Sequence, residues 1–169
     1  MNKIMKRFLL FFSIMSAHYH LGAMDRPQQF AMPRIPFTID TKPSYNERDN
    51  QYYLCARVKG IEVARVWYSF IVDTYITRMH SLRVLSSFRK QGIASALLKA
   101  CIAHAKKNQK KYVIWEAMPL EAGLTLELLI EIYKKMVHSI DPTVQLTIGA
   151  PYGPAECKKV NISMQIGEF

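Results

Sequence analysis

Cysteine is scarce in this sequence: its 169 residues include three, Cys55, Cys101 and Cys157, far apart along the chain. An odd number fits a disulfide framework poorly. Cysteines and histidines do not gather at the spacings of a metal site, so we predict no bound metal. Cys55 stands in a strand-like run and Cys101 on an apolar helical face, where cysteine acts as a small apolar residue.

Long apolar runs and the common nucleotide-binding motifs are also missing. The apolar stretch at residues 8–17 is shorter than the ~20 residues that span a bilayer comfortably. No Gly-Lys-Ser/Thr follows a glycine-rich loop, which excludes a P-loop. The three spaced glycines of the dinucleotide fingerprint are absent, as are internal repeats and low-complexity tracts.

Positive charge is what the sequence has in excess. Lys and Arg number 23 against 13 Asp and Glu, a net charge of +10, and 50% of the residues are apolar. The length suits one domain with a real core. The excess charge favours an anionic partner, which is a phosphorylated cofactor, nucleic acid or a membrane surface, and composition does not choose among them.

The first 23 residues have the pattern of a secretory signal peptide. Lys3, Lys6 and Arg7 precede the apolar stretch, and the small residues Gly22 and Ala23 follow it. We therefore exclude residues 1–23 from the fold. An uncleaved membrane anchor and a buried N-terminal helix are the alternatives.

The rest of the chain alternates between strand-like and helical patterns. Residues 24–49 are rich in proline and polar groups, which indicates a linker with one short strand over 35–39. A turn at Lys59-Gly60 predicts a hairpin between two of the strands. The apolar patterns predict strands over 51–58, 61–72, 75–85, 112–118, 143–149 and 158–166, and helices from Gly92 to the basic stretch 106–111 and over 124–137.

This order predicts a mixed α+β or α/β domain over residues 50–169. The central strand, helix and strand form a β-α-β unit whose two strands are parallel, because a crossover of that length joins parallel neighbours. The flanking hairpins make the sheet largely antiparallel. We expect helices on both faces of it.

The stretch "SSFRKQGIASALL", residues 86–98, begins where a strand turns into a helix. A helix N-terminus presents unpaired N–H groups and partial positive charge, which together can bind a phosphate. Gly92 lets the backbone approach a ligand closely, and Arg89 and Lys90 add positive charge. These residues predict a pyrophosphate site. A plain turn before a helix of small residues is the alternative.

The longer stretch "LRVLSSFRKQGIASALL" resembles the cofactor-binding motif of the GNAT superfamily of acyl-CoA-dependent N-acetyltransferases. Its pattern is Leu-x-Val-x-Pro-x-x-Arg-x-x-Gly-x-Gly/Ala, and Leu82, Val84, Arg89, Gly92 and Ala94 match it in spacing, with a serine at the proline position. The strand and helix order resembles the family from about residue 50 to 166. The family places two helices between its first two strands, and residues 40–50 leave almost no room for them. A shortened N-terminal part is therefore expected.

The resemblance implies acetyl-CoA as co-substrate. The strand with Leu82–Leu85 and the strand over 112–117 would splay apart and hold the pantetheine arm, while the loop 89–95 would bind the pyrophosphate. The cofactor-binding residues implied in this way are Leu82, Arg83, Val84, Arg89, Lys90, Gln91, Gly92, Ile93, Ala94 and Ser95.

Two residues are candidates for the chemistry. Tyr133, in "IYKKM", resembles the tyrosine of the family's Leu-Tyr-x-Lys-x-Gly-Phe landmark, which faces the thiolate; Val137 and His138 replace Gly-Phe, and Leu126 replaces a frequent asparagine. Packing on a helix face is its alternative role. His80 resembles a histidine that serves the acceptor amine in one branch of the family, and alternation along its strand predicts that it shares a face with Leu82 and Val84. A strand histidine without a chemical role is the alternative.

Glu116, at the end of the next strand, is the weaker candidate base, and a carboxylate that only faces water is its alternative. Backbone N–H groups near Leu82 and Arg83 are candidates to stabilise negative charge on the acetyl oxygen.

The function predicted from the resemblance is an N-acetyltransferase, of class EC 2.3.1, that uses direct attack in a ternary complex. The acceptor is an amine of a small molecule, peptide or protein; we expect no specific nucleic acid, and membrane contact only through the leader. The leader predicts export, with a cytoplasmic location as the alternative because acetyl-CoA is cytosolic. The other functions considered are a GNAT-like acyl-CoA-binding module without catalysis and a basic exported protein that binds anions or nucleic acid.

Overall fold

The computed structural model describes residues 34–119, 123–154 and 158–167. The predicted leader and Cys157 lie outside these residues. The described elements are β1 (Thr38–Ile39), β2 (Ser44–Asn46), β3 (Gln51–Val58), β4 (Ile61–Phe70), β5 (Ile76–Val84), the 3-10 turn η2 (Ser86–Phe88), α2 (Ile93–Lys107), β6 (Tyr112–Ala117), α3 (Leu126–Ile140), β7 (Leu146–Ile148) and β8 (Val160–Gln165).

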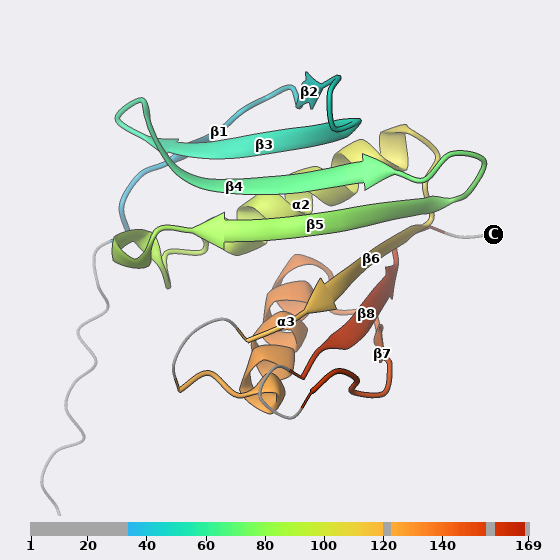
Figure 1. Ribbon diagram of the computed structural model, residues 1–169. Helices are drawn as coiled ribbons and strands as arrows, with labels where there is room; N and C mark the ends of the chain where they lie inside the picture. Colours follow the sequence, from blue (N-terminus) through green and yellow to red (C-terminus); the bar gives the residue numbers. More distant parts are fainter. Residues whose placement is uncertain (1–33, 120–122, 155–157, 168–169) are drawn as a thin grey trace, which may run out of the picture. The chain divides into compact units, whose positions relative to one another are not determined.

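The strands form one mixed sheet in the order β1-β3-β4-β5-β6-β8-β7, with β2 paired to the side of β3 (Figure 1). Strands β5 and β6 are parallel, and α2 connects them. All other strand pairs are antiparallel. The predicted α+β class, the largely antiparallel sheet and the central β-α-β unit are therefore confirmed.

The hairpin between β3 and β4 follows from two residues that accept positive φ. Lys59 has φ 50° and Gly60 has φ 81°, and a two-residue loop with positive φ at both positions suits the right-handed twist of paired strands. The predicted hairpin is confirmed. Strand β3 has the predicted bounds, and β4 ends at Phe70, two residues earlier than predicted.

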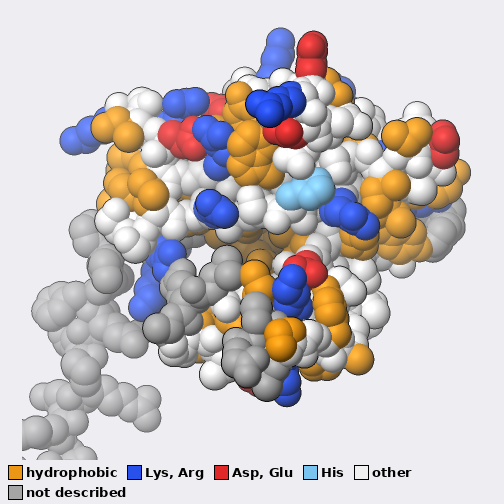
Figure 2. Space-filling view, viewed as in Figure 1, with side chains coloured by type: hydrophobic (Ala, Val, Ile, Leu, Met, Phe, Trp, Pro, Cys, Tyr) orange, Lys and Arg blue, Asp and Glu red, His pale blue; other side chains and the backbone are white. Residues whose placement is uncertain are grey.

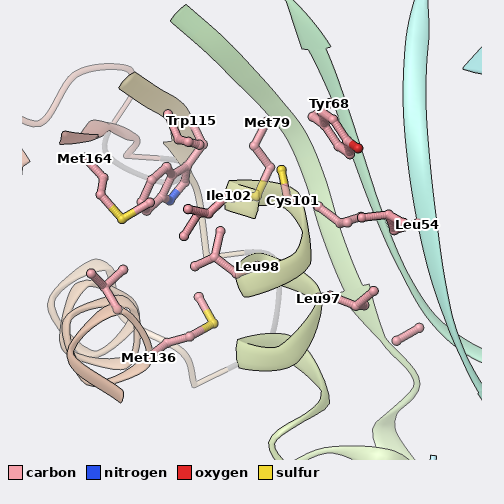
Figure 3. Close-up of a cluster of buried hydrophobic side chains, with 14 of the residues drawn as sticks. Leu54, Tyr68, Met79, Leu97, Leu98, Cys101, Ile102, Trp115, Met136 and Met164 are labelled. Carbon is pink, nitrogen blue, oxygen red and sulfur yellow. The ribbon is translucent and has the colours of Figure 1, made fainter. Parts of the chain in front are cut away.

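Both described helices cover the same face of the sheet, contrary to the expectation of helices on both faces. Tyr68, Met79, Trp115 and Ile162 are successive cross-strand partners from β4 to β8, so their side chains share one face. Tyr68 bonds to His104 of α2, and the Trp115 ring lies 5.3 Å from the Tyr133 ring of α3. The amphipathic stripes of the two helices meet this face and form the core with it (Figure 3).

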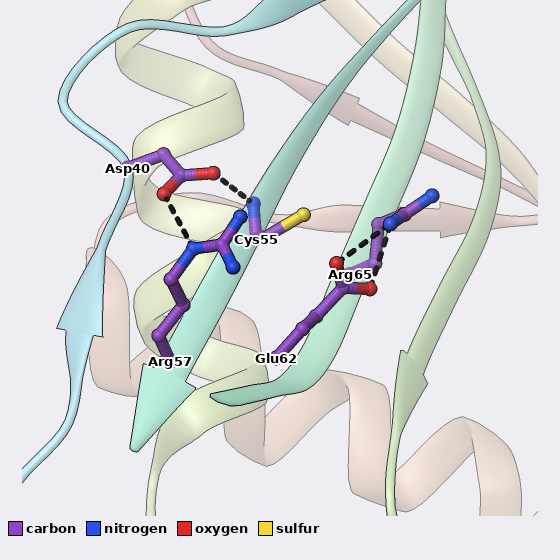
Figure 4. A network of polar contacts seen from close by, with 5 residues as sticks. All are labelled: Asp40, Cys55, Arg57, Glu62 and Arg65. Carbon is purple, nitrogen blue, oxygen red and sulfur yellow. Dashed lines mark hydrogen bonds and ion pairs between the residues drawn. The ribbon is translucent and has the colours of Figure 1, made fainter. Parts of the chain in front are cut away.

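The opposite face of β3, β4 and β5 carries polar and aromatic side chains and has no helix over it among the described residues (Figures 1 and 2). We call it the open face. Two ion pairs lie on it: Arg57 with Asp40, and Arg65 with Glu62 (Figure 4). The expected shortening between the first strands accounts for the missing cover, because residues 40–50 form only turns and the short β2.

The segment before β3 belongs to the same compact unit as the sheet, which begins at Arg34. Strand β1 pairs with β3, and the Ile35 N–H donates to Oε1 of Gln91 at 3.2 Å. The Asp40 carboxylate also accepts a bond from the Cys55 N–H at 3.2 Å. The short strand expected over 35–39 is present as two residues. No helix in the described part of the chain is long and apolar enough to cross a membrane.

Candidate functional site

The parallel strands β5 and β6 pair over only part of their length. Their register runs from Ile76 beside Tyr112 to Met79 beside Trp115, and the pairing ends there. Strand β5 continues to Val84 along β4, and β6 continues to Ala117 along β8, so the two strands diverge (Figure 1). The predicted splay is present. We call the opening beyond the Met79–Trp115 pair the fork.

The chain that leaves β5 turns sharply before it enters α2. Lys90 has φ 60° and Gly92 has φ 80°, a left-handed conformation that glycine adopts without strain. The Arg89 Nε donates to the carbonyl oxygen of Val84 at 3.2 Å, which folds the loop back against the end of β5. The loop therefore stands beside the wall of the fork that β5 forms.

Helix α2 opens at this loop with unused backbone donors. Its first intrahelical bond joins the Ala96 N–H to the Gly92 oxygen at 3.0 Å, so the N–H groups of Ile93, Ala94 and Ser95 have no acceptor inside the helix. A Cβ added at Gly92 would meet nothing within 4 Å, so there is open space over the helix start. The arrangement can bind an anion by backbone donors and partial positive charge.

The other predicted cofactor-binding residues differ in exposure and in hydrogen bonding. Leu82 and Val84 lie half-buried against the core, and Ile93 is 1% exposed, so any contact with a ligand falls mainly to their backbones. Arg83 is exposed on the open face, opposite Arg65 of β4. Among the described residues, Ser95 and Gln91 already have hydrogen bonds, from Ser139 and from the Ile35 N–H.

His80 lies on the open face, which corrects the expectation that it shares a face with Leu82 and Val84. The pairing of β4 with β5 shifts by one residue: Tyr68 pairs with Met79, whereas Trp67 pairs with Ser81. His80 is the additional residue of this β-bulge, and a bulge interrupts the alternation of faces along a strand. It lies next to the last β5–β6 pair and therefore at the mouth of the fork.

Two neighbours set the properties of the His80 imidazole. Its Nε2 is 2.9 Å from the Ser69 hydroxyl of β4. Partial burial and, secondarily, the Arg78 guanidinium lower the pKa of His80 below its ordinary value, because both disfavour the charged ring. The imidazole is therefore neutral at neutral pH and able to accept a proton.

Tyr133 lies on the opposite side of the fork, on α3. Its ring packs against Trp115, the last residue of β6 that pairs with β5, and burial raises the pKa of its phenol. A phenol with a raised pKa keeps its proton and can donate it. Within the described part of the chain no hydrogen bond of the Tyr133 hydroxyl is present.

The departures from the family landmark around Tyr133 have a packing explanation. Leu126, where an asparagine is frequent, is 6% exposed, and Val137, where glycine is usual, is 2% exposed. Both side chains belong to the core between α3 and the sheet. His138, at the phenylalanine position, is exposed.

Glu116 stands across the mouth of the fork from His80. Glu116 comes directly after Trp115 in β6, just as His80 comes directly after Met79 in β5. Its neighbours Trp115 and Ala117 are buried, so the Glu116 side chain points away from the helices. The Tyr152 hydroxyl donates to it in a short hydrogen bond, and Lys159 forms an ion pair with it at 3.0 Å. These two contacts, the Tyr152 bond first, lower the pKa of the Glu116 carboxyl.

Sequence reasoning missed Ser69 and Tyr152. Ser69 reaches His80 only because of the bulge, and Tyr152 comes from a turn-rich connection with no motif of its own. Residues 34–119, 123–154 and 158–167 contain no group of three or more His, Cys, Asp or Glu side chains that could hold a metal ion.

Comparison with known families and structures agrees with this geometry. The sequence profile of the Acetyltransferase (GNAT) family matches residues 20–122, more than half of the chain. No curated protein matches the chain by sequence.

Solved structures share the fold at low identity. The ribosomal-protein-S18-alanine N-acetyltransferase from Escherichia coli has a TM-score of 0.56 at 13% identity, over 79% of this chain and 96% of that one. A GNAT family acetyltransferase from Elizabethkingia anophelis with acetyl-CoA bound has a TM-score of 0.54 at 16% identity, over 76% and 97%. An aminoglycoside 6'-N-acetyltransferase complexed with coenzyme A has a TM-score of 0.57 at 16% identity, over 71% and 75%. At these identities the likeness shows the fold alone.

Proposed function

Because the chain belongs to the GNAT acetyltransferase family, we propose that it transfers the acetyl group of acetyl-CoA to an amine acceptor by direct attack in a ternary complex. The observation that carries this proposal is the fork between β5 and β6, which ends beside the N-terminus of α2. A fork alone would be an irregular sheet. A fork next to a set of free backbone donors has the form of a site for a long ligand with an anionic group.

The residues at the fork fit acetyl-CoA, which supplies an acetyl thioester when it is bound. The N–H groups of Ile93, Ala94 and Ser95 would hold its pyrophosphate, and the open space over Gly92 leaves room for it. Lys90 adds positive charge at the same place. The acetyl-CoA and coenzyme A bound in two structures of the same fold support this choice of ligand.

The two titratable candidates lie on opposite sides of the fork, which suits direct transfer. His80, on the open face, would take the proton of an amine that approaches from that side. Tyr133, on the helix side, would give a proton to the departing thiolate. Because acid and base are separated, both substrates can occupy the site together, and no residue has to carry the acetyl group.

A binding module without catalysis is the second candidate function. The observation that favours it is the apolar side chains Leu126 and Val137, which occupy two positions of the family landmark around Tyr133. Such a module would bind acetyl-CoA and leave added amines unchanged.

The two functions differ in one assay. The full-length protein is mixed with acetyl-CoA and a panel of amines, free thiol is followed with time, and acetylated products are identified by mass. Thiol release that depends on the added amine supports transfer. The panel contains small-molecule, peptide and protein amines. If acetyl-CoA binds but no amine in the panel causes thiol release, the result supports the binding module.

A further inference from the structure

Strand β5 presents an unusual row of side chains to the open face beside the fork. Arg78 and Arg83 are the partners of Ser69 and Arg65 in the β4–β5 register, so both point to this face. The bulge places His80 and Ser81 between them on the same face. The candidate base therefore stands between two exposed guanidinium groups.

The carboxylates near this row are already paired. Glu62 binds Arg65 through two hydrogen bonds of 2.8 and 2.6 Å, and Glu116 binds Lys159 at 3.0 Å. Arg78 and Arg83 have no ion-pair partner among the described residues. Figure 2 shows Lys and Arg side chains across this face, with acidic side chains beside some of them. The mouth of the fork thus carries an excess of two positive charges around His80.

This charge pattern selects among acceptors. A polycationic amine would be repelled by Arg78 and Arg83, whereas an acceptor with carboxylates near its amine would be attracted. The same cations favour the neutral form of an amine that comes close to His80, and the neutral form is the one that can react.

We propose that the acceptor is the free amine of an acidic peptide segment, which lies along β5 with carboxylates on Arg78 and Arg83. The proposal rests on the proposed function and names its substrate class. Because the bulge adds one residue to β5, the two arginines are as far apart as their partners Arg65 and Ser69, which lie four positions apart on β4. This is about 13 Å, which a segment of about four extended residues spans.

The form of the surface favours a peptide over an enclosed small molecule. No described helix closes the face, so an extended chain can lie on it. Next to Arg83, the Arg65 guanidinium lies 4.9 Å from the centroid of the Tyr53 ring and 5.0 Å from that of the Trp67 ring, and the centroids of the two rings are 4.7 Å apart. These cation–π contacts give an aromatic surface beside the charged row.

Peptide binding tests this proposal without any need for turnover. The test uses three peptides of equal length: one acidic, one neutral and one basic. Each has a free amino terminus and a fluorophore at the carboxyl end. Fluorescence anisotropy measures their affinities for the full-length protein at low and physiological salt. We expect the acidic peptide to bind about tenfold more tightly than the neutral one, since two exposed ion pairs contribute at this level, and the preference to shrink with salt.

Matched variants locate the binding. We expect the double variant Arg78→Gln, Arg83→Gln to lose the acidic preference. The double variant Lys99→Gln, Lys106→Gln removes the same charge from α2, on the other side of the sheet, and should keep the preference. Equal affinity for the three peptides, a preference for the basic peptide, or an unchanged Arg78/Arg83 variant would overturn the proposal. So would tighter binding of single-stranded DNA of equal charge, because the row would then serve nucleic acid.

The outcome is separable from the fate of the proposed function. Acetyl transfer to peptides without a charge preference would leave the enzyme activity and refute the acidic acceptor. A preference for the acidic peptide without any acetyl transfer would support the peptide-binding surface and refute the proposed acetyltransferase activity.

Discussion

Among single residues, the proposed acid and the proposed base at the fork have different surroundings. Tyr133 of α3 packs on Trp115, and burial raises the pKa of its phenol, which therefore stays protonated. His80 stands on the open face beside Ser69 and Arg78, so its ring is neutral near pH 7. Environments that set opposite protonation states suit an acid and a base.

Removal of the Tyr133 hydroxyl tests the acid. We predict that Tyr133→Phe lowers kcat by about a hundredfold, the usual effect of a lost general acid, while the affinity for acetyl-CoA and the melting temperature change little. Stopped-time thiol release and calorimetry give the three values. Tyr75→Phe, at the end of the sheet where β5 begins, is the control. A kcat equal to that of the control would assign Tyr133 to packing only.

The pH profile tests the base. A base works when it is deprotonated, and the lowered pKa of His80 places that change below its ordinary value of 6.5. We therefore predict that kcat/KM rises with pH at a point below 6.5. A second rise near pH 8 would belong to the amino group of a peptide acceptor.

Substitution of His80 tests whether this residue causes the rise of kcat/KM at acidic pH. His80→Gln should remove it and lower the plateau, whereas His138→Gln, an exposed histidine of α3, should keep both. A limb that persists in His80→Gln would show that another group takes the proton.

At the scale of elements, the apolar stripe of α2 holds the β-α-β unit together. Leu97 is 0% exposed and packs between the helix and the sheet (Figure 3). Burial of a leucine of this kind contributes about 2 kcal/mol. The position of the helix N-terminus beside the fork therefore depends on the core below it.

A pair of leucine substitutions tests this dependence. We predict that Leu97→Ala lowers the free energy of unfolding by about 2–5 kcal/mol, because it leaves a cavity. Leu128→Ala changes it by less than about 1 kcal/mol, because Leu128 of α3 is 51% exposed. Urea unfolding measures both. Equal effects would mean that α2 is not packed as described.

The elements differ in how far the sequence predicts them. Apolar residues at spacings of three and four located α2, and the apolar pattern that follows located α3. Aromatic and branched residues located β3 and β6. Strand β2 was not predicted, because its three residues are too few to show a repeat. Strand β7 is shorter than predicted. The splay of the fork came from the resemblance to a family and not from any spacing.

The site was less predictable than the fold for a physical reason. A bulge is a property of two paired strands. Met79 and Leu82 are three positions apart, but only the pairing with β4 shows that His80 is the additional residue. The expected face of His80 was therefore wrong. Contacts such as Ser69–His80 and Tyr152–Glu116 join residues that are distant along the chain, and without the register they could not be named.

At the scale of the whole molecule, the charge and the open face belong together. The net charge of +10 indicated an anionic partner without identifying it. The fold now separates two places for negative charge: the donors at the start of α2, and the arginines of β5 on the open face. One suits a cofactor phosphate and the other an acidic acceptor.

The N-terminal region leads to a further proposal at this scale. We propose that residues 1–23 are an export leader and are removed, on the basis of their basic and apolar pattern. N-terminal sequencing of the protein from its native cells should then begin near residue 24, and the protein should be found outside the cytoplasm. A native chain that starts at Met1 in the cytoplasm would contradict this.

The proposed function requires that acetyl-CoA binds in the fork with its pyrophosphate at the start of α2. Calorimetric titration of acetyl-CoA into the full-length protein, with Gly92→Glu and Gly60→Glu, tests it most directly. Both glycines have φ near 80° and open space for a side chain, so the variants carry the same strain and charge. We predict that the protein and Gly60→Glu bind acetyl-CoA and that Gly92→Glu does not. No binding by the folded protein, or equal binding by both variants, would rule out this cofactor site.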